Sequence, residues 1–315
     1  MIFELFDING NVVPVGKILF YELVSEAAAV CDGLRLSFTA EKNICEICIV
    51  KAYSREKLVF NGFCDKQKTV LNQNGGRCFI YARSSAALLV DNEAVPCQYS
   101  NPSARQLWFT NARELGFECC LPELYSEHSY LVPKGTSCYG AINNFVSAVC
   151  KAPVYATPEN ELKIHTESSS VKHLCDYRVL SLSYVINRSA LISDIDYKIN
   201  SADNYAYHFK STLAEKNGIK RRRLYNLSSI PLWQREITAE QKINSALEAY
   251  YSVSAELAGD CDFHIYDRVL ANADMFSCTE IFYVSEIVKS KSKNGEKTAV
   301  VLKKKTDGEL INYVA

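Results

Sequence analysis

The chain has 315 residues, which is longer than one ordinary domain, and its 48% hydrophobic and 11% aromatic residues are too many for a disordered protein. Its 35 basic and 36 acidic side chains leave a net charge of -1, so bulk charge does not predict nucleic-acid binding, although a local basic patch stays open. No uncharged run reaches the roughly 20 residues of a membrane helix, and the N-terminus lacks the regions of a signal peptide. We therefore expect a chain without a membrane partner, kept in a cytoplasm, whose 13 cysteines are reduced.

Residues 1 to about 90 carry short alternating apolar segments separated by turn signals. The Asn9-Gly10 dipeptide supplies the positive φ angles of a tight turn and predicts a hairpin. In "DGLRLSFTAE", Leu34, Leu36 and Phe38 alternate with polar neighbours, as in a half-buried strand. This spacing predicts a small antiparallel barrel or sandwich, whose further strands are "CEICIVKAYS", "EKLVFNGFCDKQKTVL" and "RCFIYAR".

The pattern changes near Asp91 to that of a small α+β unit, over residues 91–168. "SARQLWFTNARELGF" predicts a helix, with Pro102 near its first turn. "GTSCYGAINNFVSAVCKA" predicts a second helix, which Thr136 or Ser137 would cap. "PVYATPENELKIHT" then predicts a hairpin.

Residues 169–315 return to strands and include one long helical pattern. The strand segments before it are "YRVLSLSYVINRS", "SDIDYKIN" and "YAYHFKS", and those after it include "EIFYVSEIVKSKS" and "KTAVVLKKK". Ile243, Leu247 and Tyr250 fall at helical spacing, so we expect a helix over about 238–257. The expected fold class is α+β, mostly β, with antiparallel β-barrel domains at 1–90 and 169–315 on either side of the module at 91–168.

The stretch "ARSSAALLVDNEA" raises the question of a serine nucleophile at Ser84 or Ser85, with Asp91 or a histidine behind it. A nucleophile elbow needs glycines around the serine, and here the neighbours are arginine and alanine. The histidines form no recognisable partner motif; they are His128, His165, His173, His208 and His264. We expect an ordinary short helix here, and no catalytic or cofactor-binding residues in the chain.

Two groups of residues have the composition of metal ligands. Cys45 and Cys48 form a C-x-x-C pair, but an alternating strand would point their side chains to opposite faces, and no second ligand pair follows. A second group, in "GDCDFHIYDRV", alternates with apolar residues and is expected to be the solvated face of a strand; its members are Asp260, Asp262, His264 and Asp267. The sequence therefore predicts no metal site.

The strongest charge run is "KRRRLYN", from Lys220 to Asn226. A nucleic-acid site would add aromatic side chains on a sheet face or a recognition helix, and neither is evident. We expect a surface loop or a salt-bridge patch between chains. "LKKK", from Leu302, has the composition of a charged strand end.

The order of segments resembles the baseplate hub, or tail-tip, proteins of bacteriophages and phage-derived contractile particles. The first resembling segment is "VCDGLRLSF", and the second is "FNGFCDKQKTV" followed by "GRCFIYARSSAALLVDNEA". The third is "LVPKGTSCYGAINNFVSAVCKAPVYATPENELKI", in which a Pro-Gly-Thr-like turn starts a helix and a hairpin follows. "YRVLSLSYVINRSALISDIDYKIN" is similar to the start of the family's second barrel.

The resemblance implies a non-catalytic structural protein of the virion or particle, assembled in the bacterial cytoplasm. It implies two tail-tube-like barrels per chain and a homotrimeric ring that joins the six-fold tail tube to the three-fold spike. Its partners would be the tail tube protein, the spike protein and other baseplate proteins, and DNA or a tape-measure protein would pass through the channel without specific binding. It further implies that Ser84 and Ser85 cap or begin a short helix that closes the first barrel.

Two other readings stay open from the residues. One is a cell-wall hydrolase or carbohydrate-binding protein that uses a cleft in the module, where Tyr130, Tyr139 and Tyr155 would stack on sugars. The other is a sheet-rich scaffold of non-phage origin. The first predicts a monomer with a tyrosine-lined pocket, whereas a hub predicts a ring with a channel.

Overall fold

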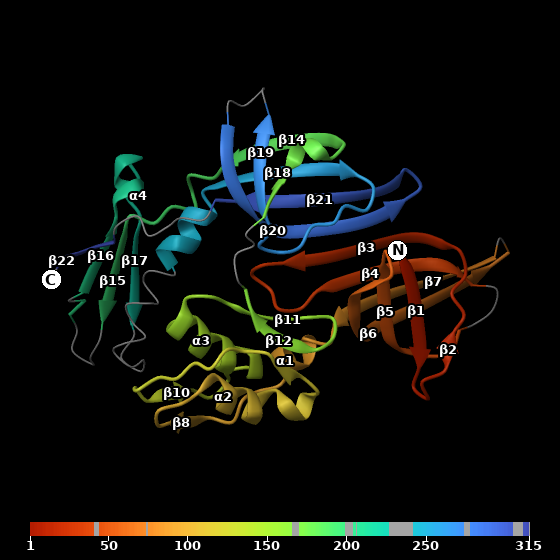
Figure 1. Cartoon of the computed structure of the whole chain (residues 1–315), viewed down its shortest axis with the longest axis horizontal. Coiled ribbons are helices and arrows are strands. Elements are labelled where there is room, and N and C mark those ends of the chain that lie inside the picture. The colour runs from red at the N-terminus through yellow and green to blue at the C-terminus, as the bar shows by residue number, and fades with distance from the viewer. Residues whose placement is uncertain are drawn as a thin grey trace.

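The protein is built mainly from antiparallel sheets, and α1, α2 and α3 lie together in one module while α4 lies beside the 4-stranded sheet (Figure 1). The computed structural model describes residues 1–40, 44–73, 75–165, 170–198, 204–205, 207–226, 242–273, 278–304 and 311–314; of 272–273, 278–279 and 311–314 it describes only the backbone. In this part of the chain, no helix has the length and apolar character needed to cross a bilayer.

The N-terminal block forms one half of a 13-stranded sheet and contains the expected strands. Cys78, Ile80 and Ala82 are buried while Phe79 and Tyr81 between them are exposed, so the period of two places one face of the sheet on a core. The Asn9-Gly10 hairpin is confirmed. The strands are β1 (Ile2–Asp7), β2 (Val12–Val13), β3 (Ile18–Glu26), β4 (Gly33–Ala40), β5 (Ile47–Ser54), β6 (Lys57–Asn72) and β7 (Gly75–Ser84).

The middle module packs three α-helices and short strands around a core of its own. Ser103 caps α2 through a hydrogen bond from the Gln106 amide (3.1 Å), and Ser137 caps α3 through one from the Gly140 amide (3.0 Å), so both predicted helices form. The elements are α1 (Ala87–Asp91), β8 (Cys97–Tyr99), α2 (Ala104–Asn111), η1 (Arg113–Leu115), β9 (Glu118–Cys119), β10 (Tyr130–Val132), α3 (Cys138–Cys150), β11 (Val154–Ala156) and β12 (Glu161–Ile164). The last two strands form the predicted hairpin.

The C-terminal half of the chain contributes to two separate sheets. One group of strands completes the 13-stranded sheet: β13 (Val171–His173), β14 (Val179–Ile186), β18 (Tyr251–Ala258), β19 (Arg268–Ala273), β20 (Cys278–Ser292) and β21 (Gly295–Lys303), with η2 (Leu174–Asp176) after β13. The other group forms a 4-stranded sheet with its own buried cluster: β15 (Asp194–Lys198), β16 (Tyr207–Ser211), β17 (Arg222–Asn226) and β22 (Ile311–Val314), with α4 (Thr212–Lys216).

The long helix expected over 238–257 is wrong in its second half. Residues 242–248 are helical, whereas 251–258 form β18 and 238–241 lie outside the described residues. Val253, Ala255 and Leu257 alternate with less buried neighbours, and the strand is hydrogen-bonded to β14 on one side and β21 on the other. The apolar residues of this segment also fit a helical pattern, but hydrogen bonding to strands on both sides stabilises the extended conformation.

The two strand-rich blocks are joined by direct strand pairing. β20 pairs antiparallel with β3, with Leu23 opposite Lys289 and Val24 opposite Val288. The sheet therefore runs from β14 through β20 and β3 to β2 without a break. The expected class, α+β and mostly β with antiparallel sheets, is confirmed. The pairings among the described strands do not close the sheet into a barrel.

Candidate functional site

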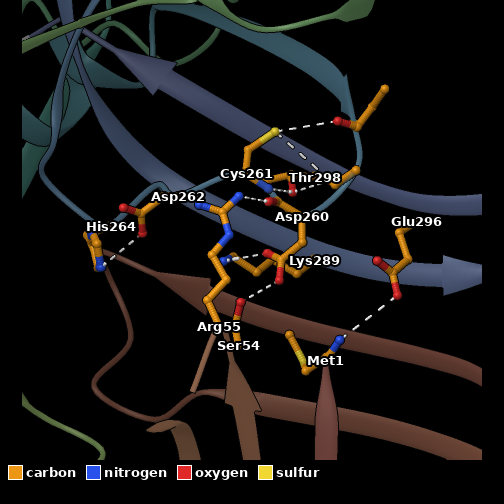
Figure 2. A network of polar contacts seen from close by, with 12 residues as sticks. Met1, Ser54, Arg55, Asp260, Cys261, Asp262, His264, Lys289, Glu296 and Thr298 are labelled. Carbon is orange, nitrogen blue, oxygen red and sulfur yellow. Dashed lines mark hydrogen bonds and ion pairs between the residues drawn. The ribbon is translucent and has the colours of Figure 1, made fainter. Parts of the chain in front are cut away.

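A network of polar contacts lies where the two strand-rich blocks meet (Figure 2). The Asp260 carboxylate, in the loop between β18 and β19, lies 2.8 Å from the Lys289 ammonium of β20. It also accepts a hydrogen bond from the Ser54 hydroxyl at the end of β5. The guanidinium of Arg55 donates to the Asp260 carbonyl at 2.8 Å. One residue of the second block thus holds the β5–β6 turn of the first.

This ion pair is largely removed from solvent. The Lys289 side chain is 12% exposed and that of Asp260 is 15% exposed. Burial alone would raise the pKa of Asp260, but the hydrogen bonds from Lys289 and Ser54 outweigh it, and the pKa lies below its usual value. Asp260 is therefore ionised in the folded chain at neutral pH, and its charge is matched by Lys289.

The loop that carries Asp260 is itself held against β21. The Thr298 hydroxyl accepts from the Cys261 amide (3.0 Å) and donates to the Gly259 carbonyl (2.8 Å). The amino group of Met1 lies 4.0 Å from Glu296, so the start of β1 also faces this region (Figure 2). The Thr298 hydrogen bonds hold the residues on both sides of Asp260 and thereby position its side chain beside Ser54.

A stack of aromatic rings joins the middle module to the second block. The His165 ring lies 3.9 Å from the Tyr155 ring and 4.0 Å from the Tyr266 ring, between ring centroids. Tyr266 stacks in turn on Tyr283 at 5.4 Å. Burial lowers the pKa of His165 to about 4, so its imidazole is neutral at pH 7. A cavity of about 560 Å³ lies beside the stack, with Pro158 among the residues that line it.

Ser84 and Ser85 connect parts of the fold and do not form a nucleophile–base pair in the described residues. The Ser84 hydroxyl accepts from the Asp32 amide at 3.0 Å, and the Ser85 hydroxyl bonds to Asn160 of the module. Neither side chain caps α1, although the Ser85 carbonyl accepts from the Leu88 amide at 3.0 Å. This stretch therefore begins the helix, as the resemblance implies. The serine side chains do not form the capping hydrogen bonds that it also implies.

Asp91 forms an ion pair with Arg83, and the hydrogen bonds of the Ser84 and Ser85 hydroxyls are made with other residues. The Arg83 guanidinium donates to both Asp91 oxygens, at 2.8 and 3.0 Å, and also binds Asp65. The hydrogen bonds from Arg83 lower the pKa of Asp91. This fork ties the end of β7 to the end of α1.

The acidic group near residue 260 does not form the solvated face of a strand, so that expectation is wrong. The segment precedes β19 and is irregular, because its backbone is held by the Thr298 contacts. Asp260 pairs with Lys289, and Asp267, which is 15% exposed, pairs with Lys172 at 2.7 Å. Within the described ranges, no cluster of three or more His, Cys, Asp or Glu side chains is placed to hold a metal ion.

The cysteine pair behaves as two separate residues. Cys45 is exposed ahead of β5, and Cys48 lies within that strand. Neither is part of a disulfide, and the other cysteines whose side chains are described are free thiols too.

The basic run is part of a strand, so the expected surface loop is wrong. Arg222–Asn226 is β17, which pairs parallel with β15. Arg222 forms an ion pair with the buried Asp196, and Arg221 donates to the Leu191 carbonyl at 2.7 Å. Much of the charge is therefore used within the 4-stranded sheet.

The tyrosines of the sugar-binding alternative are used inside the fold. The Tyr130 hydroxyl donates to the Ala141 carbonyl and the Tyr139 hydroxyl to the Val154 carbonyl, each at 2.9 Å. Tyr155 stacks on His165. These three rings do not line a common open cleft.

Sequence reasoning missed the role of Asp260 and Lys289. Asp260 was noticed only as a member of an acidic group, and Lys289 has no distinguishing local pattern. Ser54 and Asp260 are 206 positions apart, and no short-range signal links residues at that separation.

Comparison with solved structures finds this fold along almost the whole chain. A tail protein from Neisseria meningitidis MC58 matches with a TM-score of 0.75 at 12% identity, over 96% of this chain and 96% of that one. The 43 kDa tail protein of prophage MuSo2 from Shewanella oneidensis matches with a TM-score of 0.76 at 12% identity, over 96% and 98%. An E. coli component of the type VI secretion system matches with a TM-score of 0.63 at 10% identity, over 100% and 80%.

No family model matches the sequence, and no curated protein matches it either. At such low identity the structural matches establish the fold. The resemblance to phage tail-tip proteins, noted from the segment order, is confirmed at that level.

Proposed function

We propose that the protein is a structural component of a phage tail tip or of a related injection particle. The observation that carries the proposal is the match to two tail proteins over 96% of the chain, with TM-scores of 0.75 and 0.76. The match spans the N-terminal block, the module and the C-terminal half together. The similarity therefore includes how the blocks are arranged, and is not limited to one sheet of a common type. A fold alone does not determine function, so the proposed role has to be tested directly.

The finer proposal is a baseplate hub: a homotrimeric ring with a channel, which joins the tail tube to the spike. The domains would be 1–90, 91–168 and 169–315; a buried cluster of its own supports each of the first two, and the third contains two clusters. A ring that bears load needs blocks that keep their relative orientation. The β3–β20 pairing and the Asp260–Lys289–Ser54 contacts supply that rigidity.

A non-catalytic role fits the described residues. The hydroxyls of Ser84 and Ser85 are engaged in structural hydrogen bonds, and the tyrosines of the alternative cleft are engaged inside the module. No observation favours the hydrolase or carbohydrate-binding alternative over the structural role. The partners of a hub would be the tail tube protein, the spike protein and other baseplate proteins.

The test is the mass and shape of the assembly. Sedimentation would measure the mass of the purified chain and of its complex with a candidate tail tube protein, and electron microscopy would give the symmetry. A three-fold ring with a central hole supports the proposal. A monomer in the intact particle, or an assembly without a channel, contradicts it. Labelled antibody against the chain should mark the tail end of the particle.

A further inference from the structure

A shallow groove of about 860 Å³ lies on the face of the N-terminal sheet that points away from its core. Phe79 and Tyr81 stand on this face of β7, and they are 41% and 39% exposed. Exposed aromatic rings on a regular sheet lose the free energy that burial would provide, and such patches mark interaction sites when polar residues surround them.

The residues around these rings are basic. Strand register places Lys66 opposite Tyr81 and Lys68 opposite Phe79, while Arg35 lies opposite Tyr81 on the other side. Arg77 also lines the groove, and no carboxylate does. Arg35 is paired with Glu22, but no ion pair involves Lys66, Lys68 or Arg77 within the described part of the chain. The groove therefore favours an acidic segment with an aromatic or apolar side chain.

One segment of this same chain has that chemistry. In the loop between β9 and β10, Glu123, Tyr125 and Glu127 alternate, and the Tyr125 side chain is 66% exposed. The backbone is extended at Tyr125, which forms a bridge to Ser103, and side chains two positions apart in such a segment lie on the same side, about 7 Å from one another. Glu123 and Tyr125 follow this spacing, whereas Glu127 lies at the bend that comes next. The two lysines of β6 and the two rings of β7 have the same spacing, since each pair is also two positions apart in a strand.

The loop is held in shape before any contact is made. The Ala104 amide donates to the Leu124 carbonyl at 3.0 Å, and the Ser126 amide donates to the Pro102 carbonyl at 3.1 Å. A segment that is already ordered loses less conformational entropy on binding. Neither Glu123 nor Glu127 has an ion-pair partner among the residues that the structure describes, so both carboxylates are open to one.

We infer that the groove of one chain binds the loop around Tyr125 of a second copy of this chain. The groove belongs to the N-terminal sheet and the loop to the module, so the contact joins two different surfaces. Such head-to-tail contacts close into rings when the rotation permits. The inference rests on the proposed homotrimer and names the surfaces that would build it.

Charge reversal tests the inference. Lys66→Glu with Lys68→Glu should weaken the self-association constant at least about tenfold, since like charges would face each other across the contact. Glu123→Lys with Glu127→Lys should weaken it similarly. A chain with all four changes restores opposite charges at every contact and should assemble again. All four side chains are exposed, so the folded state should be kept, which circular dichroism and thermal unfolding would check.

The matched control is Lys220→Glu with Arg223→Glu, a reversal of two exposed charges, one just before β17 and one within it, which should leave the mass unchanged. A trimer that survives both groove and loop reversals overturns the inference but leaves the proposed hub standing. Loss of assembly without rescue in the four-site variant also overturns it.

A second measurement applies to the protein inside its particle. A photo-crosslinking amino acid at Phe79 should capture a peptide that contains Tyr125 from another copy. Capture of a different protein, of nucleic acid, or of no partner overturns the inference. A particle that contains the chain only as a monomer overturns both the inference and the proposed ring.

Discussion

The Asp260 carboxylate accepts a hydrogen bond from Ser54, although 206 positions of sequence separate the two residues. Ser54 ends a strand of the first block, and Asp260 lies in a loop of the second, against Lys289. The two blocks are already joined by the β3–β20 strand pairing, and this hydrogen bond connects them at a second place. It is also where a single substitution should most affect the orientation of the blocks.

Asp260→Asn should lower the free energy of unfolding by about 3 kcal/mol, because it leaves the Lys289 charge with little solvent and no opposite charge. Urea unfolding followed by fluorescence would measure the loss. The matched control is Glu256→Gln, which breaks the exposed Glu256–Lys297 pair and should cost less than about 1 kcal/mol. Equal effects of the two substitutions would show that the junction adds no special stability.

The buried His165 should make stability fall in mild acid. Its pKa is about 4 when folded, against an ordinary value of 6.5, so between these pH values the unfolded chain binds a proton that the folded chain does not. The contribution of His165 to the free energy of unfolding should therefore fall by about 3 kcal/mol as the pH drops from about 6.5 to about 4. Asp32 acts in the opposite direction over the same range, because burial raises its pKa to about 6 and the folded chain takes up a proton there.

His165→Phe keeps a ring between Tyr155 and Tyr266 and removes the titration. The free energy of unfolding of the variant minus that of the natural chain should increase as the pH drops from about 6.5 to about 4, because Asp32 contributes equally to both chains and His165 only to the natural one. An unchanged slope would mean that other groups carry the effect. Asp260 adds little over this window, because its pKa is lowered on folding and the stability it contributes is lost as the pH falls below the ordinary pKa of an aspartate, about 4.

Ser85→Ala should reduce stability by about 1 kcal/mol through the lost hydrogen bond to Asn160, and it should not change any catalytic rate. The purified natural chain should cleave neither peptidoglycan nor simple esters in release assays. Hydrolysis that is present in the natural chain and absent from Ser84→Ala or Ser85→Ala would contradict the structural role. A known peptidoglycan hydrolase serves as the positive control.

All 13 cysteines should be free in freshly made protein. Titration with a thiol reagent under denaturing, non-reducing conditions should account for nearly all of them. Burial raises the pKa of the Cys64 thiol to about 11, so the native protein should react at fewer sites than the denatured one. Stoichiometric zinc, or several disulfides, would contradict this prediction.

The elements that could be predicted from the amino-acid sequence are those whose signals are local. The alternation of Leu34, Leu36 and Phe38 specifies a strand with one buried face, and the serine at position 137 marks the start of α3. These features could be predicted because a strand's period and a helix cap depend on residues within a few positions of one another. The order of such elements was enough to indicate a tail-tip fold.

The contacts between distant segments could not be predicted from the sequence and became visible in the folded chain. Residues 251–257 fit a helical pattern until β14 and β21 pair with them on both sides, and "KRRRLYN" fits a loop until β15 lies beside it. Asp260 resembled one more surface acid until Lys289 and Ser54 were placed around it. The free energy of such contacts depends on burial and on partners far away in the chain, and neither quantity has a signature in a short window of sequence.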